Sequence, residues 1–318
     1  MDPANRSEPI AANNMNTETL DNFQLDLGTT SEIGMAVVLA TMMFAVALGL
    51  RPSSFSFLKT DSKLFLTGVA AQIIGFPLLT VLMCVVINPH PSIALGMILV
   101  ACCPGGNTSN LISLFARANT ALSVSLTATS SVFAAFVTPF SILFWSGLYP
   151  PTRALLTDIN IDVVSFLMQT LIILALPLLL GMIFRQFFPR IADRIQTPLA
   201  IFSGLALLAI ILIACFRLFP VFWALGIGIF FVVLPHNILA FSLGNFAARA
   251  INADVADRRA LTIEVGIQNS GLGIVILLTQ LNGLGGAAAV AGLWGVWHLI
   301  GGSALALFWR WKDARSNH

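Results

Sequence analysis

The chain has 318 residues, of which 57% are hydrophobic and only 9% are charged, and its mean hydropathy is +0.90. Soluble domains carry about 25% charged residues, so this composition excludes a soluble globular protein and indicates an integral membrane protein. The formal net charge of +2 is spread over the whole chain and gives no indication of a nucleic-acid partner.

Residues 1–32 differ from the rest of the chain. They contain six acidic residues against a single basic residue, Arg6. No basic segment followed by an apolar run, which would be typical of a signal peptide, occurs there. We expect a disordered extracellular or periplasmic tail.

Nine apolar runs follow, each about long enough to span a bilayer, for which about 20 residues suffice. The sequence therefore predicts an all-α polytopic membrane protein with a transmembrane domain at residues 33–309. The nine predicted spans cover residues 33–50, 64–88, 92–116, 119–146, 161–184, 197–216, 221–248, 258–281 and 286–309.

The basic residues orient these spans. Thirteen of the 16 Lys and Arg residues fall on one side of the predicted membrane, and three fall on the other. The positive-inside rule then places the C-terminal tail, residues 310–318, in the cytoplasm and the N-terminus outside. An odd number of spans places the two ends of the chain on opposite sides of the membrane, which agrees with this orientation. We expect a multi-pass protein of the plasma (cell inner) membrane.

Two predicted spans are interrupted by polar and helix-breaking residues. The third contains "ACCPGGNTSNL" at 101–111, where Pro104 removes a backbone donor and two glycines weaken the helix. The eighth contains "EVGIQNSGLG" at 264–273. Unwound backbone within a membrane persists only where it lines a protected cavity. Small residues that allow close helix packing are the alternative explanation for either break alone.

The spacing of the two breaks favours a functional role for them over close helix packing. They lie five spans apart, so their helices enter the membrane from opposite sides, and spans 64–146 and 221–309 have the pattern of inverted repeats. Interrupted segments at matching places in two halves are typical of the binding site of a secondary transporter.

Glu264 is the only acidic residue deep within a predicted span, and a charge there costs about 2.5 to 3.5 kcal/mol. A bound cation would neutralise it. Each break divides its span into two half-helices. The free carbonyl groups at the end of the first half-helix suit a small cation, and the free N–H groups at the start of the second half-helix suit an anion. Ser123 and Thr127 share one helical face, although hydroxyls at such positions commonly bond to their own helix carbonyls.

The motifs "CCPGGNTSNLISLFARANTALSVSLT" (102–127) and "ALTIEVGIQNSGLG" (260–273) resemble those of the bile acid:sodium symporter family. The resemblance runs from about residue 36 to residue 311. It implies a core of two inverted repeats whose broken helices cross, formed by spans 64–146 and 221–309. It also implies a panel domain, formed by spans 33–50 and 161–216.

The resemblance further implies two sodium sites that share Glu264, and an anion site beside the crossing. One sodium site would use Ser109, Asn110, Ser123, Thr127 and Glu264, and the other would use Gln72, Glu264, Gln268 and the carbonyls of Val265 and Ile267. The anion site would use Asn107, Thr108, Asn269 and His298. For His298, the alternative to a contact with the anion is a hydrogen-bonded histidine in the core.

These features predict a monomeric symporter that uses sodium to import an organic anion, such as a bile acid or a related carboxylate, by alternating access. A sodium/proton antiporter that uses Glu264 as the exchanging carboxylate is the alternative. Such carriers usually show a second membrane acid or a basic partner, and neither is apparent in the sequence.

Two other classes of protein fit the sequence poorly. The sequence lacks HExxH and GxSxG motifs, which argues against an enzyme. A single buried acid does not make the charged ring of a channel.

Overall fold

The computed structural model describes residues 29–51, 57–106, 108–217, 219, 227–281 and 283–316. Most of the predicted N-terminal tail, the start of the seventh predicted span and the predicted anion ligand Asn107 lie outside these residues. The described chain is all-helical, without a strand. Its elements are α2 (Thr29–Gly49), α3 (Phe57–Thr60), α4 (Ser62–Ala70), η2 (Ala71–Gly75), α5 (Phe76–Ile87), α6 (Pro91–Ala101), α7 (Thr108–Phe115), α8 (Thr120–Leu148), α9 (Pro150–Asp158), α10 (Val163–Phe187), α11 (Pro189–Arg217), α13 (Gly228–Ala250), α14 (Val255–Gly266), α15 (Ser270–Gln280) and α16 (Gly285–Ser316).

Six helical segments in the described residues are long and apolar enough to cross a membrane. They are Ser62–Ile87, Thr120–Leu148, Val163–Phe187, Pro189–Ile210, Gly228–Ala250 and Gly285–Arg315. Many of their large apolar side chains face outward, as lipid contact requires. The chain is therefore a polytopic integral membrane protein.

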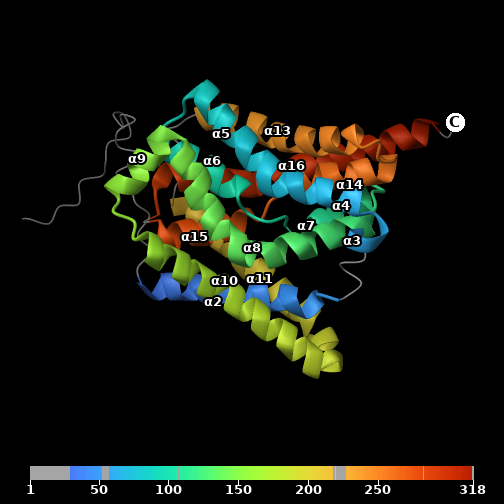
Figure 1. The fold of residues 1–318 in the computed structure, drawn as a ribbon, viewed down its shortest axis with the longest axis horizontal. Helices are drawn as coiled ribbons and strands as arrows, with labels where there is room; N and C mark the ends of the chain where they lie inside the picture. Colours follow the sequence, from blue (N-terminus) through green and yellow to red (C-terminus); the bar gives the residue numbers. More distant parts are fainter. Residues whose placement is uncertain are drawn as a thin grey trace, which may run out of the picture.

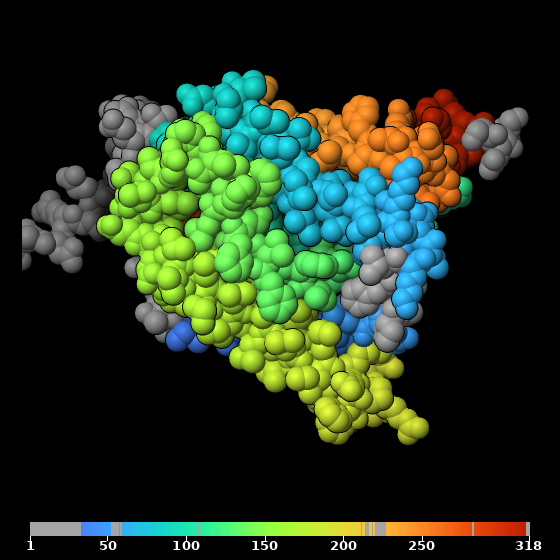
Figure 2. Space-filling view, viewed as in Figure 1, coloured from blue at the N-terminus to red at the C-terminus, as the bar shows by residue number. Residues whose placement is uncertain are grey.

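The helices form two neighbouring groups. Helices α2, α10 and α11 pack against one another and lie together along one edge of the molecule in Figure 1. The segments α4 to α7, α13, α14 and α16 lie on the other side, and the turn between α10 and α11 projects from the body in Figure 2. The first group contacts the rest mainly through α8, α15 and α16.

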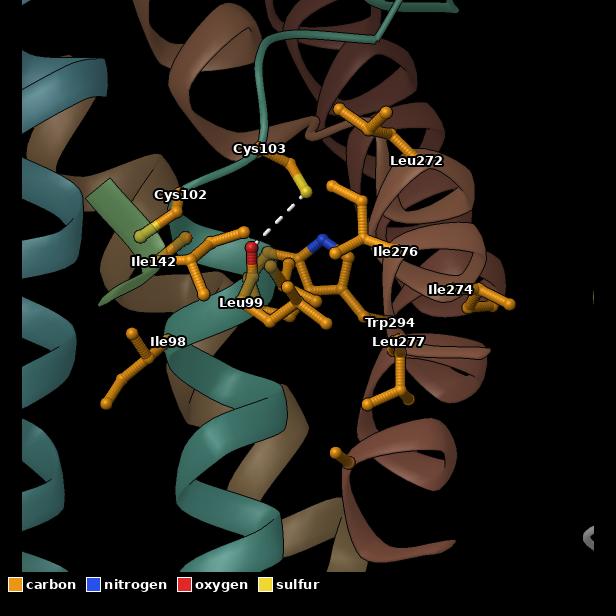
Figure 3. Packing of buried hydrophobic residues seen from close by; sticks show 14 of the residues in the cluster. Ile98, Leu99, Cys102, Cys103, Ile142, Leu272, Ile274, Ile276, Leu277 and Trp294 are labelled. Carbon is orange, nitrogen blue, oxygen red and sulfur yellow. Dashed lines mark hydrogen bonds between the residues drawn. The ribbon is translucent and has the colours of Figure 1, made fainter. Parts of the chain in front are cut away.

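The main hydrophobic core surrounds α6. Figure 3 shows Leu99 and Cys103 facing Ile276 of α15 and the fully buried ring of Trp294 from α16. The Cys103 thiol donates to the Leu99 carbonyl over 3.2 Å. Cys84, Cys102 and Cys103 are free and buried, as expected for small core residues.

Three features differ from the sequence-based prediction. A short helix, α9, starts at Pro150 and Pro151 in a predicted loop, because proline is well suited to the first turn of a helix. A π-helical segment, η2, separates α4 from α5. The last helix extends through Ser316 into the predicted tail, where Arg315 stacks on Trp311 with its guanidinium carbon 3.9 Å from the ring centroid.

Candidate functional site

The two helix breaks lie where the sequence predicts them. Helix α6 ends at Ala101 and α7 begins at Thr108, while α14 ends at Gly266 and α15 begins at Ser270. The unwound segments pair with each other. Gly106 N donates to Ile267 O over 3.1 Å, and Asn269 N donates to Pro104 O over 2.8 Å. An isolated antiparallel bridge joins Gly105 to Gln268. This pairing satisfies backbone groups that membrane burial would otherwise leave without partners.

Glu264 lies in the last turn of α14, directly before the paired unwound segments, which we call the crossing, and is 1% exposed. Its carboxylate accepts three hydrogen bonds from hydroxyl groups of α7 and α8. Oε2 accepts from Ser109 Oγ at 2.7 Å and from Ser123 Oγ at 2.9 Å. Oε1 accepts from Thr127 Oγ1 at 2.6 Å. In the described residues no basic side chain forms an ion pair with it.

Asn110 completes this cluster. Its Oδ1 lies 2.9 Å from Ser123 Oγ and 3.3 Å from Thr127 Oγ1. The structure thus brings together all five residues predicted for the first sodium site: Ser109, Asn110, Ser123, Thr127 and Glu264.

The cluster holds more close oxygen pairs than it has protons to bridge them. Each hydroxyl has one proton, and the bonds to Glu264 use those of Ser109, Ser123 and Thr127. With the side-chain amide of Asn110 oriented so that Oδ1 faces Ser123, the Ser123 hydroxyl then has no proton left to donate to this oxygen. A bound cation would remove this conflict by coordinating several of these oxygens at once. Carboxylate, amide and hydroxyl oxygens are hard ligands, suited to a hard cation.

Three residues predicted for the second sodium site, Gln72, Glu264 and Gln268, lie around Gly105. A Cβ added to Gly105 would stand 2.3 Å from Glu264 Oε1 and 2.9 Å from Gln72 Nε2. Both side chains therefore approach the Gly105 backbone more closely than any other residue type would allow. Gln72 and Gln268 are buried at 2% and 1% exposure, and Gln268 pairs with Gly105 through the backbone bridge.

Each of these two glutamines has one amide atom without a hydrogen-bond partner among the described residues, Nε2 of Gln72 and Oε1 of Gln268. Val265 O accepts from Gln268 Nε2 at 3.0 Å, and Ile267 O accepts from Gly106 N. Each carbonyl oxygen keeps a second lone pair. The unpaired Gln268 oxygen and these lone pairs are the kind of donor set that a second cation requires.

The described anion ligands predicted from the sequence lie at the starts of α7 and α15 and on α16. Thr108 is exposed at the start of α7, and Asn269 is partly buried at the start of α15. Asn269 Oδ1 caps α15 by accepting from Leu272 N at 3.0 Å. His298 is 5% exposed on α16, and no hydrogen bond in the described residues joins it to Thr108 or Asn269. The starts of α7 and α15 directly follow the paired unwound segments.

Some residues at the site were not predicted from the sequence. Ser113 Oγ donates to Ser123 Oγ at 3.2 Å, and Gly105 N donates to Ser130 Oγ at 3.3 Å. Asn237 donates through Nδ2 to Gly266 O at 2.9 Å and so caps α14 at the break. A buried amide within an apolar span was the available signal for Asn237.

The fold and this oxygen-rich site at two paired helix breaks define an integral membrane protein of the secondary-transporter class. The chain belongs to the sodium bile acid symporter family, whose family model matches residues 36–219.

Several named relatives are similar to the chain. An uncharacterized sodium-dependent transporter of Bacillus subtilis (strain 168), YocS, is 31% identical over 87% of this chain and 83% of its own length. A probable chloroplastic sodium/metabolite cotransporter of Arabidopsis thaliana, BASS1, is 33% identical over 80% of this chain and 60% of its own length. The ileal sodium/bile acid cotransporter of Mus musculus is 24% identical over 79% and 70%. The chain is thus a member of a family of sodium-dependent transporters, embedded in a membrane and acting on small organic solutes.

Proposed function

We propose that the protein is a sodium-coupled symporter that imports an organic anion by alternating access. The observation that carries this proposal is the environment of Glu264. Its buried carboxylate lies in a cluster with four polar side chains, none of them basic, and the close oxygen pairs of this cluster outnumber the protons available to bridge them. A sodium ion would supply the missing positive charge, whereas an arginine partner would have made a fixed structural pair.

The proposed architecture has nine membrane spans. A core of inverted repeats comprises spans 64–146 and 221–309, and a panel comprises spans 33–50 and 161–216. The mutual packing of α2, α10 and α11, and the pairing of the two breaks, support this division. We place the N-terminus outside and the C-terminus in the cytoplasm of the plasma (cell inner) membrane, and we expect a monomer.

Two sodium ions would bind on either side of the Glu264 carboxylate. The first would be held by the hydroxyl cluster of α7 and α8, and the second by the glutamine side chains and carbonyls at the crossing. Sharing one carboxylate makes the two sites interdependent, because each ion reduces the cost of burying the charge that the other also needs.

The anion would dock at the start of the second half-helices. Helices α7 and α15 begin at Thr108 and Ser270, directly after the paired segments, and their first N–H groups attract negative charge. Sodium binding orders the crossing and thereby prepares this surface for the anion. A bile acid or another metabolite with a carboxylate head would suit it, with Thr108, Asn269, Asn107 and His298 as candidate contacts.

The coupling has an electrical consequence. Two sodium ions entering with one monovalent anion carry one net positive charge. At 100 mV, inside negative, this contributes about 2.3 kcal/mol to accumulation of the anion. Import should therefore be electrogenic.

The test is uptake into proteoliposomes of a radiolabelled bile acid and, in parallel, a keto acid. We expect an inward sodium gradient to drive accumulation of at least one of them, and an equal potassium gradient to drive none. Uptake that ignores sodium would contradict the proposal. A rise of the internal pH of the vesicles on addition of external sodium, without an organic anion, would instead support the sodium/proton antiporter, because sodium would enter in exchange for protons.

A further inference from the structure

Arg259 is the one Lys or Arg residue that the described part of the chain buries, with 8% exposure. It lies on α14 five residues before Glu264. It makes no ion pair with that carboxylate, so the charge of the guanidinium has another use.

The guanidinium joins three elements. Its Nη1 donates to the Ala116 carbonyl at 3.0 Å and to Asp313 Oδ2 at 2.8 Å. Its Nη2 donates to Asp313 Oδ1 at 2.5 Å. Ala116 directly follows α7, and Asp313 belongs to the end of α16. Trp309 of α16 covers the guanidinium at 5.5 Å from its ring centroid. Bidentate, partly buried pairing of this kind fixes both distance and orientation.

The carbonyl that Arg259 contacts lies within a defined helix end. Arg117 adopts a left-handed conformation with φ of 55°, Ala118 N donates to Ser113 O, and Arg117 N donates to Leu114 O. This is a Schellman motif, which satisfies the preceding carbonyls of α7 internally. The Ala116 carbonyl is directed outward from the motif and is available to Arg259.

Both half-helices connected by this contact are short. Helix α7 has eight residues and begins directly after one break, and α14 has twelve residues and ends directly before the other. Helices of this length are marginal on their own, so their positions depend on contacts with neighbours. A small apolar cluster from α7, α14 and α16 lies beside the guanidinium and includes Ile112, Ile263 and Ala306.

We propose that Arg259 is a positioning residue for sodium binding: by joining the end of α7 to Asp313, it fixes the Glu264 carboxylate relative to Ser109 and Asn110. This inference rests on the proposed function, because it concerns the sodium site of that function. We call the contacts of Arg259 with Ala116 and Asp313 the clamp. The clamp holds the end of α7 remote from the break and a point on α14 five residues before Glu264, so it controls the spacing of the oxygens without touching the ion.

The test is a sodium titration of Arg259→Gln. Glutamine removes the charge and the bidentate geometry. We expect the sodium concentration for half-maximal anion uptake to rise by roughly tenfold, within the range of long-range coupling effects. The KM for the anion at saturating sodium should stay within about twofold of the wild-type value. Arg259→Lys, which keeps the charge, should recover part of the loss.

A second readout does not depend on transport. Sodium raises the melting temperature of a protein that binds it only when folded. The sodium concentration that gives half of this shift should rise in Arg259→Gln by the same factor as in uptake. Asp313→Asn, altered at the more exposed partner, should move it in the same direction, and this variant decides the question if Arg259→Gln does not fold.

Asp193→Asn is the matched control, because it breaks ion pairs of Arg51 at 3.0 Å and Arg185 at 2.9 Å within the α2, α10 and α11 group. It should leave the sodium titration unchanged. A wild-type sodium titration in both Arg259→Gln and Asp313→Asn would overturn the inference, as would an equal shift in Asp193→Asn. Failure of the wild-type protein to couple uptake to sodium would overturn the proposed function instead, and the thermal titration would still test the clamp.

Discussion

Glu264 Oε1 and Thr127 Oγ1 lie 2.6 Å apart, although 137 residues separate them in the chain. This contact joins the α14 half-helix to α8 at the level of both breaks. It makes the hydroxyl of Thr127 a direct partner of the charge on which the proposed coupling depends.

Replacing Thr127 with valine should weaken sodium binding. The change preserves the side-chain shape but removes one charge-assisted hydrogen bond and one prospective ion ligand, which we expect to raise the half-saturating sodium concentration about tenfold or more. Thr129→Val on the same helix is the control. Its hydroxyl is buried without a hydrogen-bond partner among the described residues, so its removal should leave sodium dependence and folding intact. Equal effects of the two variants would rule out a specific role for Thr127.

A methyl group at Gly105 should block the site directly. Its Cβ would stand 2.3 Å from Glu264 Oε1, which is closer than any real contact. We expect Gly105→Ala to reduce sodium-driven uptake by at least about a hundredfold, since the unwound segment pairs with Gln268 and has little room to retreat. Gly147→Ala, with nothing within 4 Å of its added Cβ, should transport normally. Full sodium-driven uptake by Gly105→Ala would show that the carboxylate and the crossing are not arranged as described.

Gln72 allows the second sodium ion to be tested apart from the first. Gln72→Leu removes an amide next to Glu264 but leaves the hydroxyl cluster of α7 and α8 in place. We expect the Hill coefficient for sodium to fall from about two to about one, because cooperativity cannot exceed the number of sites. Gln169→Leu, at an exposed amide of α10 that donates to Ser165, should leave the Hill coefficient for sodium unchanged. A Hill coefficient that stays near two in Gln72→Leu would exclude Gln72 from the second site.

Asp257, at the start of α14, should make stability depend on pH. Burial raises the pKa of this carboxyl, and the nearby charges of Asp254 and Asp61 raise it further, although Asn119 donates to it at 2.7 Å and partly offsets the rise. A raised folded-state pKa means that the folded protein binds more protons than the unfolded chain between the two pKa values. The stability contribution is therefore favourable at low pH and is lost as pH rises through the folded pKa.

Asp257→Asn should accordingly show a slightly higher melting temperature than the wild type at pH 7.5, while its Oδ1 still accepts from Asn119. The difference should shrink as the pH is lowered towards 4.5, which thermal melting in detergent at several pH values will measure. A lower melting temperature for the variant at pH 7.5 would mean that the charge of Asp257 is structurally required.

The sequence predicted the centre of the site better than its surroundings. Proline, glycine and amides within apolar runs located both breaks, and Glu264 was conspicuous as a lone acid. The ligand sets came from the family motifs and not from spacing. The structure brings the first set into contact, whereas the assignment of each residue to sodium stays a prediction.

The remaining features depend on contacts that no local pattern encodes. The π-helical turn that carries Gln72 has an ordinary apolar sequence, "AQIIG", and π-bulges of this kind recur at functional sites. The pairing of Arg259 with Asp313 joins residues 54 positions apart, and Asp313 lay in a segment predicted to be only a tail. The anion ligands came only from the family resemblance, and their assignment stays a prediction, since no described hydrogen bond joins His298 to Thr108 or Asn269.

The most direct test of the central claim is equilibrium binding of radioactive sodium to the purified protein, compared between the wild type and Glu264→Gln. We predict saturable binding of two ions per chain in the wild type and its loss in the variant, because both proposed sites share this carboxylate. Undiminished sodium binding by Glu264→Gln would contradict the account.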